Sequence, residues 1–243
     1  MRVSRLYTSV ELQVGQTIEL DENSSHYLRT VLRLRTGDRL ILFNGDGADY
    51  CANLVEMNRK SVIVTLTERK LRSVESPLRI NLGLGISRGD RMDLSIQKAV
   101  ELGVNQITPI MTERCVVQFN AEKKQQRLQH WQKIIYHAAE QSGRTALPNL
   151  APIMSLADWL PHPQGLKVFL DPYAENTLLT VKPEQNQVTL LTGPEGGFAE
   201  MEREFAISHG FVPIRLGQRI LRTETASLAA LAAVQMLWGD FGQ

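Results

Sequence analysis

The hydrophobic pattern of this chain changes its period near residues 71–77, and that change limits the folds the chain can adopt. Before it, residues 17–20, 39–43, 50–56 and 61–67 are β-branched or alternate between apolar and polar, as strands do. After it, strand-like and helical segments alternate. Because residues 71–77 are polar and end in a proline, we expect a boundary there between domains of residues 1–72 and 77–243.

The first domain is predicted to be a small β-barrel. The sequence Asn-Gly-Asp-Gly at residues 44–47 lies between two strand-like segments and indicates a hairpin turn. One helix is predicted to interrupt the strands, capped by Ser24 or Ser25 and reaching about Leu34.

The second domain is predicted to be an α/β domain with a mainly parallel sheet, because its strands alternate with helices. We expect strands at residues 79–87, 107–111, 167–170, 188–191 and 212–216, and helices at residues 90–102 and 121–142 and after each of the last two strands. The final helix, residues 225–237, is apolar on nearly all sides. Such a helix needs cover from its own domain or from a second subunit, and both remain open.

The amino-acid composition by itself excludes few classes of function. The net charge of this 243-residue chain is +1, so contact with nucleic acid would need a local cluster of arginines. Cys51 and Cys115 lack CxxC spacing, which favours buried, reduced thiols in a cytoplasmic protein. The five histidines have no metal-ligand spacing, so we expect no metal. We also expect no signal peptide and no membrane span.

Two glycine-bearing loops carry the functional signal, residues 191–198 (LTGPEGGF) and 216–226 (LGQRILRTETA). Each follows an apolar strand and precedes a helix, which is where α/β proteins place their ligand site. A turn without a ligand would explain one such loop, but two favour a site. Neither has the GxGxxG or P-loop spacing, and Glu195 places a carboxylate where a phosphate would bind, so we expect a ligand that is not mainly phosphate. The bare backbone amides of the glycines could bind a flat nitrogenous ring.

The chain resembles the SPOUT methyltransferases, and among them the RsmE type, which methylates N3 of a uridine in 16S ribosomal RNA of the small ribosomal subunit. The resemblance covers nearly the whole chain. Its segments are residues 2–7 (RVSRLY), 26–38 (HYLRTVLRLRTGD), 97–104 (QKAVELGV), 113–117 (ERCVV), 131–144 ending in EQSGR, and the two glycine-bearing loops. One departure is Ala199, where relatives commonly have a Ser or Thr helix cap, a loss of about 1 kcal/mol.

The resemblance implies an S-adenosylmethionine site in a C-terminal trefoil knot, in a homodimer whose small first domain is PUA-like. Chains otherwise rarely thread their own loops. The residues implied to bind the cofactor are Leu170, Thr192, Gly193, Glu195, Gly196, Leu216, Gly217, Ile220, Leu221, Thr225 and Ala226. Backbone amides of Leu216, Ile220 and Leu221 would meet the adenine. For Glu195, a contact with the cofactor and a hydrogen bond within its own loop are both open.

Methylation of uracil N3 requires loss of the N3 proton and stabilisation of the charge left on the neighbouring carbonyls. Arg222 is the candidate for that stabilisation, because a guanidinium stays charged and offers a planar fork of donors. Glu224 is a second catalytic candidate. It could accept the proton, orient Arg222 or cap the final helix, and water could accept the proton instead.

The candidate RNA-binding residues are Arg2, Arg5, His26, Arg29, Arg33, Arg88 and Arg91. His26, Arg29 and Arg33 have the spacing of one helix face, for which a solvated basic surface is the alternative. By similarity, the PUA-like domain would grip the RNA. Arg114 and Arg144 could reach the site from a partner subunit. The alternatives for the whole chain are a methyltransferase for another RNA position, such as a ribose 2′-hydroxyl, and a non-catalytic RNA-binding assembly factor.

Overall fold

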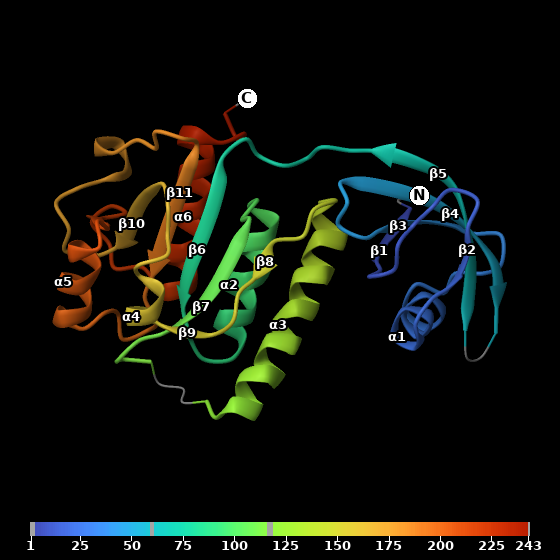
Figure 1. Cartoon of the computed structure of the whole chain (residues 1–243), viewed down its shortest axis with the longest axis horizontal. Coiled ribbons are helices and arrows are strands. Elements are labelled where there is room, and N and C mark those ends of the chain that lie inside the picture. The colour runs from blue at the N-terminus through green and yellow to red at the C-terminus, as the bar shows by residue number, and fades with distance from the viewer. Residues whose placement is uncertain (1–2, 59–60, 116–118, 243) are drawn as a thin grey trace. The chain divides into compact units, whose positions relative to one another are not determined.

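The computed structural model describes residues 3–58, 61–115 and 119–242, and it divides the chain into two compact units (Figure 1). Residues 76–135 and 148–243 make up the second unit. The first unit comprises residues 1–75 and also residues 136–147, which include the end of helix α3 (Ala121–Ser142). Where two continuous domains were expected, the first unit thus takes a segment from the second half of the chain.

The first unit contains one five-stranded sheet in the order β1-β3-β4-β5-β2. Its strands are β1 (Ser4–Tyr7), β2 (Thr17–Glu19), β3 (Arg39–Phe43), β4 (Ala48–Met57) and β5 (Val62–Leu71). The predicted turn at residues 44–47 joins β3 to β4. In the described part of the chain, the edge strands β1 and β2 do not pair with each other, so the sheet is open and is not the closed barrel that we expected.

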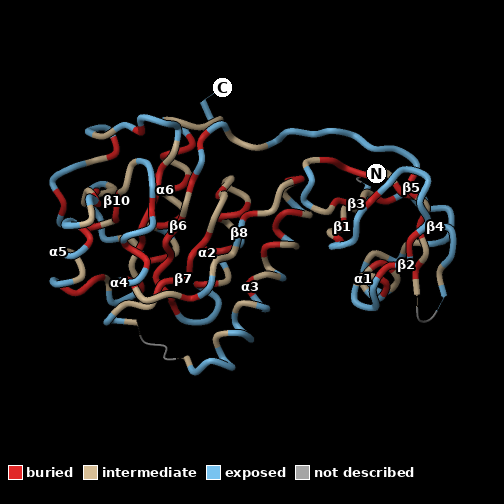
Figure 2. Tube along the Cα trace, in the orientation of Figure 1, coloured by how far each residue is buried: buried red, intermediate tan, exposed pale blue. Residues whose placement is uncertain are grey.

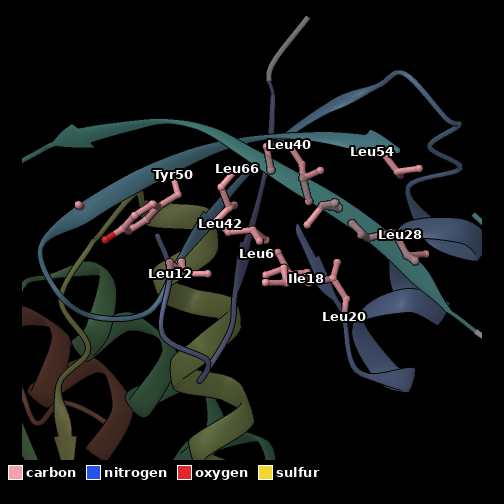
Figure 3. Packing of buried hydrophobic residues seen from close by; sticks show 14 residues of the cluster. Leu6, Leu12, Ile18, Leu20, Leu28, Leu40, Leu42, Tyr50, Leu54 and Leu66 are labelled. Carbon is pink, nitrogen blue, oxygen red and sulfur yellow. The ribbon is translucent and has the colours of Figure 1, made fainter. Parts of the chain in front are cut away.

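The core of the first unit is built mainly from leucines and valines of the sheet and from Leu28 (Figure 3). Leu40 and Leu42 alternate with residues that are more exposed along β3, and both are fully buried. This is the period-2 pattern expected of a sheet with one buried face. The cluster explains why the strands of this unit could be predicted from alternation.

The helix of the first unit begins earlier than predicted. Asp21 is the N-cap of α1 (Glu22–His26), and its carboxylate accepts the Ser24 amide at 3.0 Å. Ser25, one of the two expected caps, is buried, and its hydroxyl donates to the Leu20 carbonyl. The other, Ser24, lies within α1, so the predicted cap was wrong.

The same helix continues as a π-helical turn, η1 (Tyr27–Val31), and ends at Val31, with Leu32 as its C-cap, instead of at about Leu34. Arg33 then has a φ of 52°, and the Leu34 amide donates to the Leu28 carbonyl, which closes the helix. A π-turn has more residues per turn than an α-helix. Val31, the last residue of this turn, is 60% exposed.

The second unit contains a parallel sheet in the order β12-β10-β11-β6-β7-β8, with β9 also paired to β7. Its strands are β6 (Arg79–Gly85), β7 (Gln106–Met111), β8 (Asn149–Leu150), β9 (Met154–Ser155), β10 (Leu166–Leu170), β11 (Gln187–Thr192) and β12 (Val212–Ile214). The predicted parallel sheet is confirmed. The two-residue strands β8 and β9 were not predicted, because they are too short to show a pattern.

Helices cover the sheet of the second unit. They are α2 (Asp90–Glu101), α4 (Leu156–Trp159), α5 (Glu200–Ser208), α6 (Thr223–Trp238) and the first part of α3, together with the 3-10 turn η2 (Leu178–Thr180). Helices α2 and α6 pack against each other. Residues of α4 and α5 form a separate apolar cluster with β7, β10 and β11. Buried residues run along the central strands (Figure 2).

Close packing explains the glycines of β6. A Cβ at Gly83 would lie 2.5 Å from the Trp159 ring, and Gly83 is the register partner of Leu191, which belongs to the same apolar cluster. Only a residue without a side chain fits there. The small residues that alternate with leucines in β6 therefore let α4 approach the sheet.

Helix α6 is covered on part of its surface by the second unit. Ala230, Leu231 and Val234 are buried, whereas Met236 is 62% and Leu237 is 41% exposed. The helix also begins two residues before the predicted start. Cys51 and Cys115 are free thiols, as expected, but both are half-buried instead of buried.

Candidate functional site

The candidate site is a pocket of about 810 Å³ in the second unit, at the carboxyl ends of neighbouring parallel strands. Three segments of the chain contribute most of its lining: the end of β10 with residues 171–173, the loop after β11, and the loop between β12 and α6. The last two are the glycine-bearing loops of the sequence analysis, and the first contains Leu170, which the resemblance implied for the cofactor. The carboxyl edge of a parallel sheet is where α/β proteins bind their ligands.

The first glycine-bearing loop has a tight turn. The Gly197 amide donates to the Pro194 carbonyl at 2.9 Å, and Gly197 has a φ of 64°. A Cβ at Gly85 of β6 would lie 2.5 Å from the Pro194 nitrogen, and a Cβ at Gly196 would lie 2.9 Å from the Arg114 Cβ. The loop is therefore pressed closely against its neighbours and is held in one place.

Among the described residues, Glu195 bonds to another segment of the chain and makes no hydrogen bond within its own loop. Its Oε1 accepts a hydrogen bond from the Arg88 amide at 3.0 Å and one from Arg91 Nη1 at 3.4 Å. The carboxylate thus connects the loop to the segment that begins α2. Glu195 also lines the pocket, so its contact with the cofactor stays a prediction.

A second contact braces the same loop from the segment after β7. Glu202 on α5 accepts the Glu113 amide at 2.8 Å through Oε1 and the Ala199 amide at 2.9 Å through Oε2. Arg114 Nη1 donates to the Gly196 carbonyl at 3.2 Å. Because Ala199 has no side-chain oxygen, Glu202 supplies the capping contact at the start of α5.

The loop between β12 and α6 offers main-chain donors. Among the described residues, the backbone amides of residues 216–222 have no acceptor. Gly217 has a φ of 77° with open space around it, and Ile220 is 77% exposed. Unpaired amides beside apolar side chains suit a flat, nitrogen-rich ring such as adenine. The residues present therefore fit an adenosyl group.

The end of β10 adds an ion pair that the sequence did not reveal. Asp171 is 5% exposed, and its carboxylate accepts from Arg203 of α5 and from the Tyr173 amide at 2.9 Å. Both members of the pair line the pocket. They are 32 residues apart and belong to no motif, so no local signal could have found them.

Of the two predicted catalytic residues, one lines the pocket and the other does not. Arg222 is the N-cap of α6, is exposed, and lines the pocket. Glu224 does not line it, and its Oε2 is buried without a hydrogen-bond partner among the described residues. Only Arg222 is therefore placed to touch a ligand.

The predicted cofactor set gathers at the pocket with one exception. Thr225 lies on the first turn of α6 and does not line the pocket. The residues that do line it are Leu170, Thr192, Gly193, Glu195, Gly196, Leu216, Gly217, Ile220, Leu221 and Ala226.

The predicted RNA-binding residues of the first unit divide into two groups. His26 and Arg33 are exposed, and Arg29 donates to the Asn58 carbonyl at 3.0 Å. Arg5, in contrast, is 8% exposed and is paired with Asp49 at 2.6 Å. Its guanidinium is committed to the protein interior, which corrects its expected role in RNA binding. Arg2 lies outside the described residues.

Four further arginines, considered as RNA-binding or partner-subunit residues, also have defined places in the structure. Arg88 is exposed, and Arg91 lines the pocket beside Glu195. Arg114, considered as a partner-subunit residue, lines the pocket of its own chain. Arg144 belongs to the first unit, where it is 4% exposed and pairs with Glu75 at 2.5 Å, so it is not available to the site.

No group of three or more His, Cys, Asp or Glu side chains within residues 3–58, 61–115 and 119–242 is arranged to hold a metal ion. No helix in the described part of the chain is long and apolar enough to cross a membrane. Guanidinium groups, carboxylates and backbone groups of two glycine-bearing loops line the pocket.

Comparison with known proteins agrees with this site. A family model described as an RNA methyltransferase domain matches residues 74–235, and one described as an RNA methyltransferase PUA domain matches residues 20–67. The fold and the site thus define an RNA methyltransferase with a PUA domain.

The relatives identify the family more closely. A ribosomal RNA small subunit methyltransferase E of Buchnera aphidicola is 37% identical over 98% of each chain. A protein of that name from Neisseria gonorrhoeae, solved with S-adenosylmethionine, is 39% identical with a TM-score of 0.92, over 99% of this chain and 100% of that one. A Legionella pneumophila methyltransferase, also solved with S-adenosylmethionine, is 38% identical with a TM-score of 0.96 and the same coverage. This chain belongs to the ribosomal RNA small subunit methyltransferase E family.

Proposed function

We propose that this protein transfers a methyl group from S-adenosylmethionine to N3 of a uridine in 16S ribosomal RNA of the small ribosomal subunit. The observation that carries the proposal is the pocket at the ends of β10, β11 and β12, with its row of unpaired amides. Relatives of the same family have been solved with this cofactor.

S-adenosylmethionine, when bound, supplies a methyl group activated by the sulfonium. The amides of Leu216, Ile220 and Leu221 would hold the adenine, and Gly196 would let the backbone come close to the ribose or methionine part. Ala226 would close the pocket beside them. Thr225 is left out of this proposal because it lies outside the pocket.

Arg222 would act on the base. Its guanidinium would donate to a uracil carbonyl oxygen and stabilise the negative charge that forms when N3 loses its proton. The position of Glu224 outside the pocket favours water as the acceptor of that proton. The enzyme's other task is to hold N3 in line with the methyl group.

The function is tested by mass spectrometry of 16S ribosomal RNA from cells that lack this protein. We expect one uridine to lose a methyl group on its base, and purified enzyme with S-adenosylmethionine to restore it. Loss of a ribose methyl instead would establish the alternative methyltransferase, and unchanged modification would establish an assembly factor.

The role of Arg222 is tested by Arg222→Ala. We expect kcat to fall by on the order of a hundredfold or more, while the dissociation constant for S-adenosylmethionine changes little, because the guanidinium acts on the base. The matched control is Arg79→Gln, an exposed arginine of β6 outside the pocket. Equal losses of turnover and cofactor affinity would refute the catalytic assignment.

The first unit is proposed to grip the RNA through His26, Arg29 and Arg33. Exposure of His26 and Arg33 supports this, as does the PUA family match. We expect His26→Ala and Arg33→Gln to weaken binding of 16S ribosomal RNA without changing cofactor affinity. Arg88 and Arg91 of the second unit are proposed to contribute beside the pocket.

We further propose a homodimer, a trefoil knot in the C-terminal half, a cytoplasmic location and no metal requirement. The exposed Met236 and Leu237 on α6 support a subunit contact. Light scattering of the purified protein tests the dimer, and the double variant Met236→Glu, Leu237→Glu should be monomeric.

The knot and the metal have separate tests. An experimental structure with an unthreaded backbone would refute the knot, and loss of activity on addition of a chelator would refute the absence of a metal requirement.

A further inference from the structure

The pocket carries more positive charge than its cofactor can use. Of the described residues, six arginines but only three acidic residues line it. S-adenosylmethionine has a positive sulfonium, a positive amino group and one carboxylate, so it is itself a cation. A cationic pocket repels such a ligand. The excess charge therefore needs an anion other than the cofactor.

The guanidinium groups of three of these arginines bond to other residues of the chain. Arg91 pairs with Glu195, Arg203 pairs with Asp171, and Arg114 donates to the Gly196 carbonyl. Each of these contacts fixes a loop at the rim of the pocket. These three arginines therefore have a framework role, to which Arg91 adds its proposed contact with RNA.

The other half have unused donors. In the described part of the chain, the guanidinium groups of Arg215, Arg219 and Arg222 have neither a hydrogen bond nor an ion pair. Arg215 follows β12, its backbone amide is fixed to the Asn176 carbonyl at 2.9 Å, and its Nε is buried without a partner. Arg219 is exposed on the loop after Gly217. Arg222 is already assigned to the base.

We propose that Arg215 and Arg219 bind phosphates of the RNA backbone on either side of the target nucleotide. A guanidinium binds a phosphate through two parallel hydrogen bonds, and it suits sites where a planar donor fork must hold an anion. The two residues lie on the loop that also holds Arg222, so phosphate binding there would fix the base beside it. This inference rests on the proposed RNA substrate.

The experiment compares Arg215→Gln and Arg219→Gln with the wild-type protein. The probe is 30S subunits from cells lacking this protein, and their binding and methylation are measured between 50 and 200 mM salt, roughly the range in which phosphate contacts are lost. Each variant should raise the KM for RNA on the order of tenfold and reduce the salt slope of binding by about 0.7–0.9 per lost phosphate contact. Calorimetry should give the wild-type affinity for S-adenosylmethionine within about twofold.

Arg127→Gln is the matched control, because Arg127 is exposed on α3 and outside the pocket. Arg219→Lys should retain part of the salt slope, since it keeps the charge but loses the fork. An unchanged salt slope in both glutamine variants would overturn the inference. Weaker cofactor binding with an unchanged RNA slope would also overturn it, because the arginines would then hold the methionine carboxylate.

Failure of the proposed function and failure of this inference give different results. If the wild-type protein binds the subunits but methylates another atom, the salt slopes of the variants still show whether Arg215 and Arg219 contact phosphates. If wild-type protein binds no RNA at any salt concentration, both the inference and the RNA substrate are refuted.

Discussion

Single glycines set the position of the cofactor loop. Gly85 has no unusual backbone angle, and its requirement is purely one of space, since a Cβ there would lie 2.5 Å from a backbone nitrogen of the neighbouring loop. A backbone atom cannot rotate away as a flexible side chain can. The residue type at position 85 is therefore dictated by a contact 109 positions further along the chain, at Pro194.

We predict that Gly85→Ala lowers the affinity for S-adenosylmethionine by at least about tenfold, because Pro194 must shift and the amides of the loop shift with it. Overpacking should also cost about 1–3 kcal/mol of stability. Calorimetric titration and thermal denaturation measure the two effects. Gly242→Ala, where the nearest atom would be at 3.4 Å, is the matched control. A folded Gly85→Ala variant with wild-type affinity would contradict this reading.

At the scale of elements, α5 begins without a side-chain cap and is held by a later residue. Glu202 satisfies the Ala199 amide and the Glu113 amide together. The expected weakening at Ala199 is therefore offset within the same turn. Glu202 is a positioning residue, since it does not line the pocket.

We predict that Glu202→Ala lowers the free energy of unfolding by about 1–3 kcal/mol and raises the KM for S-adenosylmethionine, because two amides lose a charged acceptor. The free energy of unfolding of Glu202→Gln should lie between those of the wild type and Glu202→Ala, since one carbonyl oxygen remains as an acceptor. The exposed Glu204 on the same helix supplies the control Glu204→Ala, expected within about 0.5 kcal/mol of wild type. An unchanged KM in Glu202→Ala would remove the positioning role.

Helix α1 gives a pH-dependent prediction. Burial acts to raise the pKa of Asp21, but hydrogen bonds from Ser24 and from the Asn23 amide outweigh it and lower the pKa from its ordinary value of 3.8. A carboxyl with a lowered pKa in the folded state stabilises the fold above its ordinary pKa, and this contribution is lost as the pH falls.

We therefore expect Asp21→Ala to destabilise the protein by about 1 kcal/mol at neutral pH. The difference from wild type should shrink as the pH falls below 3.8. Scanning calorimetry at several pH values measures it, with the exposed Glu11→Ala as control. A difference that persists unchanged below pH 3 would show that the N-cap carboxylate is not its source.

At the scale of the whole molecule, the first unit is assembled from distant parts of the sequence. Arg5 Nη1 donates to the Ala139 carbonyl at 3.1 Å, and Nη2 donates to the Arg144 carbonyl at 3.2 Å. The same guanidinium lies 4.5 Å from the centre of the Phe43 ring. One arginine therefore connects β1 and β3 with the segment that ends α3.

We predict that Arg5→Gln costs about 3–5 kcal/mol of stability, because it leaves the buried carboxylate of Asp49 with only the longer contact to Arg72. S-adenosylmethionine affinity of the folded variant should stay at the wild-type value, since the pocket lies in the second unit. Thermal denaturation and calorimetric titration test both statements, with the exposed Arg39→Gln as control. Wild-type stability of Arg5→Gln would contradict the structural role of Arg5.

Local patterns determined most of the elements and the loops of the site. The 22-residue helix α3 has the predicted bounds, because its periodic stripe and the glycine after it are both short-range signals. The three pocket loops follow strands that are apolar enough to recognise. Ten of the eleven residues that the resemblance implies for the cofactor line the pocket, because they lie in loops whose course depends on sequence neighbours.

The sequence by itself determined the alternation of strands and helices, the loops that carry the glycines, and the family. Only the tertiary structure decided that Arg5 and Arg144 are buried, that Glu195 faces Arg88 and Arg91, and that Asp171 meets Arg203. The local sequence around a charged residue is the same whether its side chain faces solvent, RNA or a buried partner. Its partner is fixed by contacts between residues far apart in the chain, which no local pattern encodes.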